Sequence, residues 1–153
     1  MSATSWSFYN RARKYISGTI NLGSGTFDLH LFTSASNFAT VTISTLGSLT
    51  SQVSSASGYT TAGKQLASVT WSTGASAKQI AFNAAAVVQS AIAGTISNIK
   101  GAVIVARTGA SAKATANKLL CFSTLSSSQF SISSGNTLTI TPAATGIFTL
   151  AGA

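Results

Sequence analysis

Few residues in this chain have side chains that could carry catalytic chemistry. Its 153 residues include one carboxylate side chain, Asp28, and one histidine, His30, and there is no Glu. Together with the many serines, these two residues supply the types found in a Ser-His-Asp triad. Side chains two residues apart on a strand, however, project in parallel about 7 Å from each other, whereas a triad needs a hydrogen bond between Asp and His. We therefore interpret Asp28 and His30 as polar side chains on the outer face of a strand.

A second segment is similar to a phosphate-binding loop. Residues 58–64 read Gly-Tyr-Thr-Thr-Ala-Gly-Lys, but Gln65 follows the lysine at the place where a P-loop has Ser or Thr. No helical pattern follows, so we interpret the segment as a turn. The single carboxylate also excludes paired-carboxylate hydrolysis, two-metal catalysis and a carboxylate calcium site. We predict that the protein is not an enzyme and uses no cofactor or metal.

The N-terminal segment combines aromatic and basic residues. Trp6 and Phe8 precede Arg11, Arg13 and Lys14, so that three of the nine basic residues stand within four positions. One interpretation is contact with nucleic acid, with cations on phosphates and rings stacked on bases. The other is an amphipathic helix docked on its own sheet with its basic side toward a partner subunit. We favour the second, because the aromatic residues fall on or beside the apolar stripe of the helix.

Composition limits the classes of protein and partner. Charged residues make up 7% of the chain, hydrophobic residues 45%, and the formal net charge is +8. This supply of apolar residues is sufficient for one folded domain, which we predict to span residues 1–153. The net positive charge is compatible with an acidic protein, nucleic acid or a membrane surface as partner. The lone Cys121 stands in an apolar run and is expected to be a small buried side chain.

No segment of the sequence predicts export or membrane insertion. The first residues lack the apolar stretch of a secretory signal. Polar residues interrupt the most apolar stretch, residues 80–99, so it falls short of a membrane helix. We expect a soluble protein made in the cytoplasm, with no membrane partner.

Periodicity predicts one helix, over residues 7–17. Its apolar stripe at helical spacing consists of Phe8, Ala12, Tyr15 and Ile16. We expect Ser5 or Ser7 to cap its start and Gly18 to take the left-handed conformation at its end.

The rest of the chain favours short strands separated by turns. Alternation places Phe27, Leu29 and Leu31 on one strand face, opposite Asp28 and His30. Further strands are predicted over residues 39–43, 66–71, 79–82, 87–92, 102–106, 118–123, 130–132, 138–141 and 147–150. Many short strands with one helix predict an all-β fold, an antiparallel β-sandwich or jelly roll with one short N-terminal helix. The serine-rich residues 44–57 are either a long loop or a mobile arm.

Three blocks of sequence are informative through their order and spacing. The first block is Phe8-Tyr9-Asn10, then Ile16-Ser17-Gly18-Thr19-Ile20-Asn21-Leu22 and the strand over residues 26–32. The second is Gly58-Tyr59-Thr60-Thr61-Ala62-Gly63-Lys64-Gln65-Leu66, which leads into Val69-Thr70-Trp71. The third runs from Gly101-Ala102-Val103-Ile104-Val105 through Leu119-Leu120 to Gly135-Asn136-Thr137-Leu138-Thr139-Ile140-Thr141-Pro142 and Gly146-Ile147-Phe148-Thr149-Leu150. The blocks span nearly the whole chain, and taken together they resemble a family of small virion proteins of tailed phages.

This resemblance implies a β-sandwich protein of the mature particle that cements or decorates the capsid shell. The implied partner is the major capsid protein, and the implied location is the virion. A homo-oligomer on the particle is expected, although neither dimer nor trimer is selected. On this hypothesis Arg11, Arg13 and Lys14 bind the shell, with Trp6 and Phe8 as apolar anchors.

The chain departs from that family at two places where relatives tend to carry acidic residues. Here these places hold Asn83-Ala84-Ala85-Ala86 and Ala106-Arg107-Thr108. An acidic, metal-linked or pairing role there is therefore not carried over. Two alternatives stay open: a tail, adaptor or fibre-base component of the virion, and, less favoured, a free nucleic-acid-binding protein.

Overall fold

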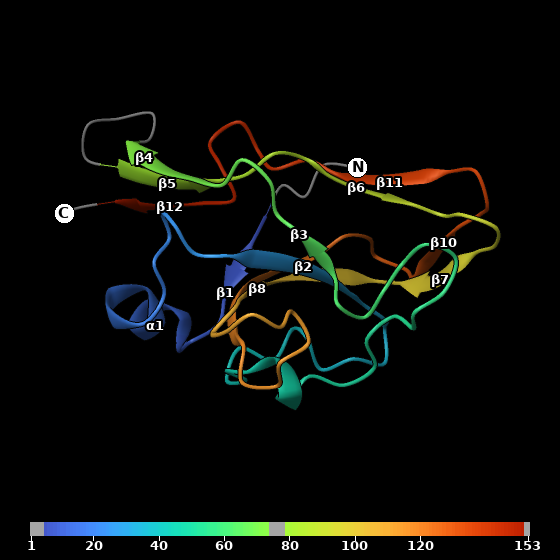
Figure 1. The fold of residues 1–153 in the computed structure, drawn as a ribbon, viewed down its shortest axis with the longest axis horizontal. Helices are drawn as coiled ribbons and strands as arrows, with labels where there is room; N and C mark the ends of the chain where they lie inside the picture. The colour runs from blue at the N-terminus through green and yellow to red at the C-terminus, as the bar shows by residue number, and fades with distance from the viewer. Residues whose placement is uncertain (1–4, 74–78, 152–153) are drawn as a thin grey trace.

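The protein is an all-β sandwich of antiparallel sheets with one short α-helix (Figure 1). The computed structural model describes residues 5–73 and 79–151. In chain order, the elements are β1 (Ser7–Phe8), α1 (Ala12–Gly18), β2 (Phe27–Phe32), a 3-10 turn (Leu46–Ser48), β3 (Lys64–Gln65), β4 (Thr70–Thr73), β5 (Gln79–Asn83), β6 (Val87–Ser90), β7 (Ile96–Ile99), β8 (Gly101–Ala106), β9 (Lys118–Thr124), β10 (Phe130–Ile132), β11 (Thr137–Ile140) and β12 (Phe148–Ala151). The predicted fold class is confirmed.

One layer is a five-stranded sheet in the order β1-β9-β8-β2-β3, and the separate pair β10-β7 lies beside it, with β7 in contact with β2. The other layer consists of the sheet β12-β5-β4 and the pair β11-β6, which lie along the top of the molecule in Figure 1. Aromatic rings join the layers: the ring centroids of Phe27 in β2 and Phe82 in β5 are 5.0 Å apart. Within the second layer, Phe82 stacks on Phe148 at 5.0 Å. This interlayer cluster holds the two layers together by burial of aromatic surface.

The central strands are buried on both faces. All six residues of β2 and all six of β8 are buried. One face of β2, with Phe27, packs on the second layer, while Phe32 on the other face lies near the ring of Phe38 in the loop that follows β2. The expectation that Asp28 and His30 lie on an outer face is therefore wrong, because long loops cover the face that alternation would leave to solvent.

The serine-rich residues 44–57 are a long loop that binds the body of the protein. The backbone of Leu46 bonds to Asn117, and the N–H of Val53 donates to the carbonyl of Leu31 in β2. Leu46 and Val53 are buried. Contacts at both ends of the loop favour the loop interpretation over a projecting arm.

The predicted helix over residues 7–17 is wrong in its first part. Ser7 and Phe8 form β1, which pairs with the edge of β9, so a tertiary pairing overrides the helical spacing. Helix α1 is preceded by Arg11, which makes no side-chain capping bond, rather than by Ser5 or Ser7. The expected left-handed Gly18 is also wrong, because Gly18 is the last helical residue and Thr19 ends the helix at φ −121° and ψ −32°.

Among the strands, most predicted segments are present with ends shifted by one or two residues. Residues 39–43 form turns instead of a strand, and β4 begins at Thr70, four residues later than predicted. The strands β3 and β7 were not predicted. In β7 the buried residues stand at the two ends of the strand instead of at alternate positions, so its sequence has no period-two pattern that would predict a strand. The backbone is also irregular there, since Asn98 has a positive φ of 63°.

Candidate functional site

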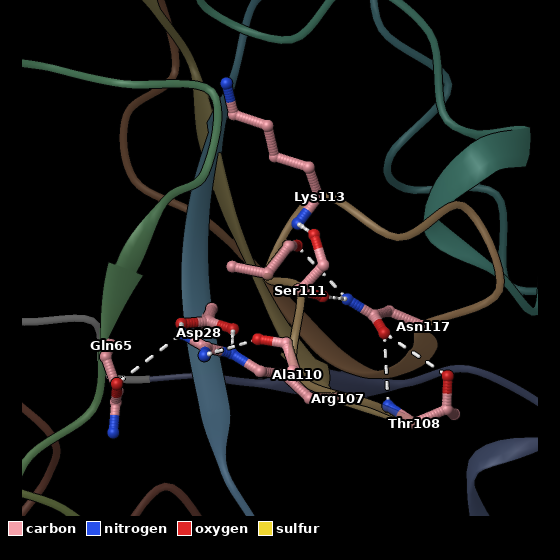
Figure 2. Close-up of polar contacts among 9 residues, drawn as sticks. Asp28, Gln65, Arg107, Thr108, Ala110, Ser111, Lys113 and Asn117 are labelled. Carbon is pink, nitrogen blue, oxygen red and sulfur yellow. Dashed lines mark hydrogen bonds and ion pairs between the residues drawn. The ribbon is translucent and has the colours of Figure 1, made fainter.

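Asp28 forms a buried ion pair with Arg107, at the junction of β2, β8 and β3 (Figure 2). The guanidinium donates from Nε to Oδ2 at 2.6 Å and from Nη2 to Oδ1 at 2.7 Å. Nη1 also donates to the carbonyl of Ala110 at 3.3 Å, and Nη2 lies 3.5 Å from Oε1 of Gln65. The hydrogen bonds to Asp28 raise the pKa of Arg107. The one carboxylate side chain of the protein is thus occupied within the fold.

The loop after Arg107 is held in shape by the buried side chain of Asn117. Its Oδ1 accepts from the backbone N–H of Thr108 at 3.1 Å, and its Nδ2 donates to the carbonyls of Ser111 and Ala112. Figure 2 shows Lys113 extending away from this cluster. Asn117 therefore closes the loop across its base, and Arg107 is held at the same base.

His30 belongs to a second buried polar network, on the same strand face as Asp28. Its Nδ1 lies 3.0 Å from Nε2 of Gln52, which also bonds to the hydroxyl of Tyr59 and the carbonyl of Thr61. The Tyr59 hydroxyl in turn accepts the backbone N–H of Leu31. Burial lowers the pKa of His30 to about 4, against an opposing effect of Asp28, so the ring is neutral at pH 7. This network joins the central strand to the loop that covers it.

The geometry does not assemble a Ser-His-Asp triad. The Asp28 carboxylate binds Arg107, and within the described ranges Nε2 of His30 is buried with no hydrogen-bond partner. Cys121 is buried as predicted, and burial raises the pKa of its thiol, which disfavours the reactive thiolate. No group of three or more His, Cys, Asp or Glu side chains in residues 5–73 and 79–151 could hold a metal ion.

The five predicted contact residues fall into two groups. Trp6 and Phe8 are half-buried against the core, and the ring of Phe8 meets that of Phe148 edge-on at 4.5 Å. Arg11, Arg13 and Lys14 are exposed on and beside α1. The aromatic residues pack within the protein, while the basic residues remain at the surface.

A fourth cation, which sequence reasoning missed, lies beside this helix. Lys118, at the start of β9, places Nζ 5.3 Å from the ring centroid of Tyr15 in α1. Because Lys118 is far from Tyr15 in the sequence, only the packing of α1 on β9 brings the two side chains together. We call the set Arg11, Arg13, Lys14 and Lys118 the α1 basic surface. Among the described residues, none of the four forms an ion pair.

An open cleft of about 410 Å³ adjoins the α1 basic surface. One wall is the second half of α1 with the chain that follows it, residues 16–22, and the other includes Trp71 of β4. In Figure 1 the sheet β12-β5-β4 lies above α1 at this end of the molecule. The cleft therefore combines a helix flank with the end of the second layer.

Comparison of the chain with protein-family models, with curated proteins and with solved structures finds no match. The described part of the chain also contains no helix long and apolar enough to span a membrane.

Proposed function

We propose that this chain is a structural protein of a tailed-phage virion that binds the capsid shell and stabilises it. The observation that carries the proposal is the distribution of charge. Asp28 is bound inside the fold by Arg107, while the α1 basic surface has no ion-pair partner among the described residues and its helix cations are exposed. A surface of this kind favours an anionic partner, and an acidic face of the major capsid protein is the partner proposed here.

The three sequence blocks that resemble tailed-phage virion proteins support the same proposal. A cement protein acts by adding contacts across the junctions between shell subunits, which requires a rigid body rather than a catalytic site. A two-layer sandwich with an aromatic interlayer cluster is suited to that role. Repetition in many copies makes weak individual contacts effective, since linked binding events add avidity.

The first experiment is the copy number of the protein in purified phage particles, measured by quantitative mass spectrometry against the major shell protein. We expect a fixed stoichiometric ratio to the shell protein. A handful of copies per particle would instead favour the tail, adaptor or fibre-base alternative. Absence from the particle would contradict the virion proposal.

The second experiment reverses charge on the α1 basic surface. We expect the triple variant Arg11→Glu, Arg13→Glu, Lys14→Glu to lose most of its occupancy on particles that lack the native protein. Lys64→Glu is the matched control, because Lys64 lies on β3 at the opposite edge of the five-stranded sheet from β1. Unchanged occupancy of the triple variant would exclude these residues as the docking surface.

The nucleic-acid alternative shares the same basic surface but lacks one of its usual parts. Proteins that bind single strands without sequence preference offer aromatic faces on which bases stack. Here the rings of Trp6 and Phe8 pack against the core, which leaves less of their surface for bases. A steep fall of DNA affinity with added salt would favour this alternative, because phosphate contacts release counterions.

A further inference from the structure

On one side of the cleft beside α1, apolar side chains continue along the sheet past the residues that line the cleft. Trp71 is the cross-strand partner of Phe82, and Ile80 lies two residues before Phe82 on the same face of β5. Phe82 is fully buried, but Ile80 is 44% exposed. In Figure 1 the sheet β12-β5-β4 extends past the start of β2, above α1. Trp71 lines the cleft, and Ile80 lies diagonally across from it on the same sheet face, outside the lining, so the two extend an apolar strip from the wall of the cleft.

The opposite side of the cleft carries positive charge. Ile16 and Ser17 line the cleft, and Arg13 lies three and four residues before them, on the same side of the helix. Lys14 is in the same relation to Ser17 and Gly18. Both cations are exposed and, among the residues described, unpaired with any carboxylate. An occupant of this cleft thus meets apolar surface on one side and cations on the other.

We propose that the cleft binds an extended acidic peptide segment with apolar side chains, supplied by the shell protein. Its carboxylates would pair with Arg13 and Lys14, and an apolar side chain would cover Trp71 and Ile80. Charge complementarity selects this occupant, since the chain has a single carboxylate side chain of its own and Arg107 already binds it. The inference rests on the proposed function and names which part of the shell is bound. It also replaces Trp6 and Phe8 by Trp71 and Ile80 as the apolar contacts.

The test uses the full chain and a short fluorescein-labelled peptide that alternates Glu and Leu. We expect saturable binding by fluorescence anisotropy, with affinity reduced about fivefold or more by Arg13→Glu and little changed by the matched control Lys64→Glu. Quenching of tryptophan fluorescence by the unlabelled peptide reports the place of binding, because Trp71 lines the cleft. The variant Trp71→Phe is expected to lose that quenching while it still binds the peptide.

Two further probes separate charge from apolar contact. A peptide that alternates Glu and Ser is expected to bind more weakly than the Glu and Leu peptide, and a Lys and Leu peptide is expected not to bind. Equal loss of affinity in Arg13→Glu and Lys64→Glu would overturn the inference, since it would mean attraction to net charge alone. Tighter binding of an oligothymidylate at the same cleft would also overturn it in favour of nucleic acid. The peptide assay contains no particles, so its failure is distinguishable from a negative copy number.

Discussion

Arg107 and Arg13 are the same residue type in two different surroundings. Arg107 forms a bidentate ion pair with the carboxylate of Asp28, whose side chain is 1% exposed. It directly follows β8, a strand whose residues are all buried. Arg13 stands on the exposed side of a seven-residue helix and, among the described residues, has no acidic partner. With one carboxylate side chain in the sequence, the fold can give an acidic side-chain partner to only one of these two arginines. The comparison shows how internal use of that carboxylate leaves the outer surface basic.

The two regions also differ in what holds them. The face of β2 with Asp28 and His30 is covered by loops that bond to it through polar side chains, among them Gln52 and Arg107. Helix α1 is held mainly by burial of Ala12 and partial burial of Tyr15 and Ile16. Changes in the first region should therefore alter stability, and changes in the second should alter binding.

The largest effect on stability is expected from Asp28→Asn. It removes the charge partner of Arg107 inside the fold, and breaking such a pair destabilises because the remaining charge is poorly compensated. Since Arg107 is partly exposed, we expect a loss of about 2–3 kcal/mol in the free energy of unfolding. Urea denaturation followed by circular dichroism measures it, with Lys64→Gln as the exposed control. A loss no larger than that of the control would show that the pair has no structural role.

A smaller effect is expected from pH through His30. Its pKa is about 4 in the folded protein and near 6.5 when exposed, so the unfolded chain takes up a proton that the folded chain does not. Stability is therefore complete above pH 6.5 and falls as the pH drops toward 4, by about 2 kcal/mol between pH 7.5 and pH 5.

Urea midpoints measured across that range test this prediction. The variant His30→Gln should flatten the dependence whatever its own stability, because His30 is the only histidine in the chain. A dependence of the same slope in the variant would assign it to another group.

The smallest effect on stability is expected from the α1 basic surface. Arg11, Arg13 and Lys14 are exposed, and surface substitutions of this kind change the free energy of unfolding by less than about 0.5 kcal/mol. Replacing all three by Glu should leave the urea midpoint nearly unchanged while particle occupancy falls. A large loss of stability in this variant would remove the contrast between the two regions.

Prediction from the sequence succeeded where local pattern and burial agree. The run over 102–106 predicts a strand because it is continuously apolar, and β8 is buried on both faces. Strand β10 has the predicted ends. Alternation in β2 correctly placed Phe27 toward the core, but it could not tell that loops cover the other face. The helix prediction failed at Phe8, because β1 pairs with β9, a strand that lies far away in the sequence.

The same division holds for the candidate site. The sequence alone determined that the protein is basic and that Asp28 is its one carboxylate side chain. It also determined that Arg11, Arg13 and Lys14 lie close together, because these facts need only residue types and short separations along the chain. Only the tertiary structure decided that Arg107 forms an ion pair with Asp28 and that Lys118 lies against the ring of Tyr15 in α1. It also decided that Trp71 lines the cleft while Trp6 packs against the core. Those contacts join residues far apart in the chain, and their geometry arises only when the layers, loops and helix pack together.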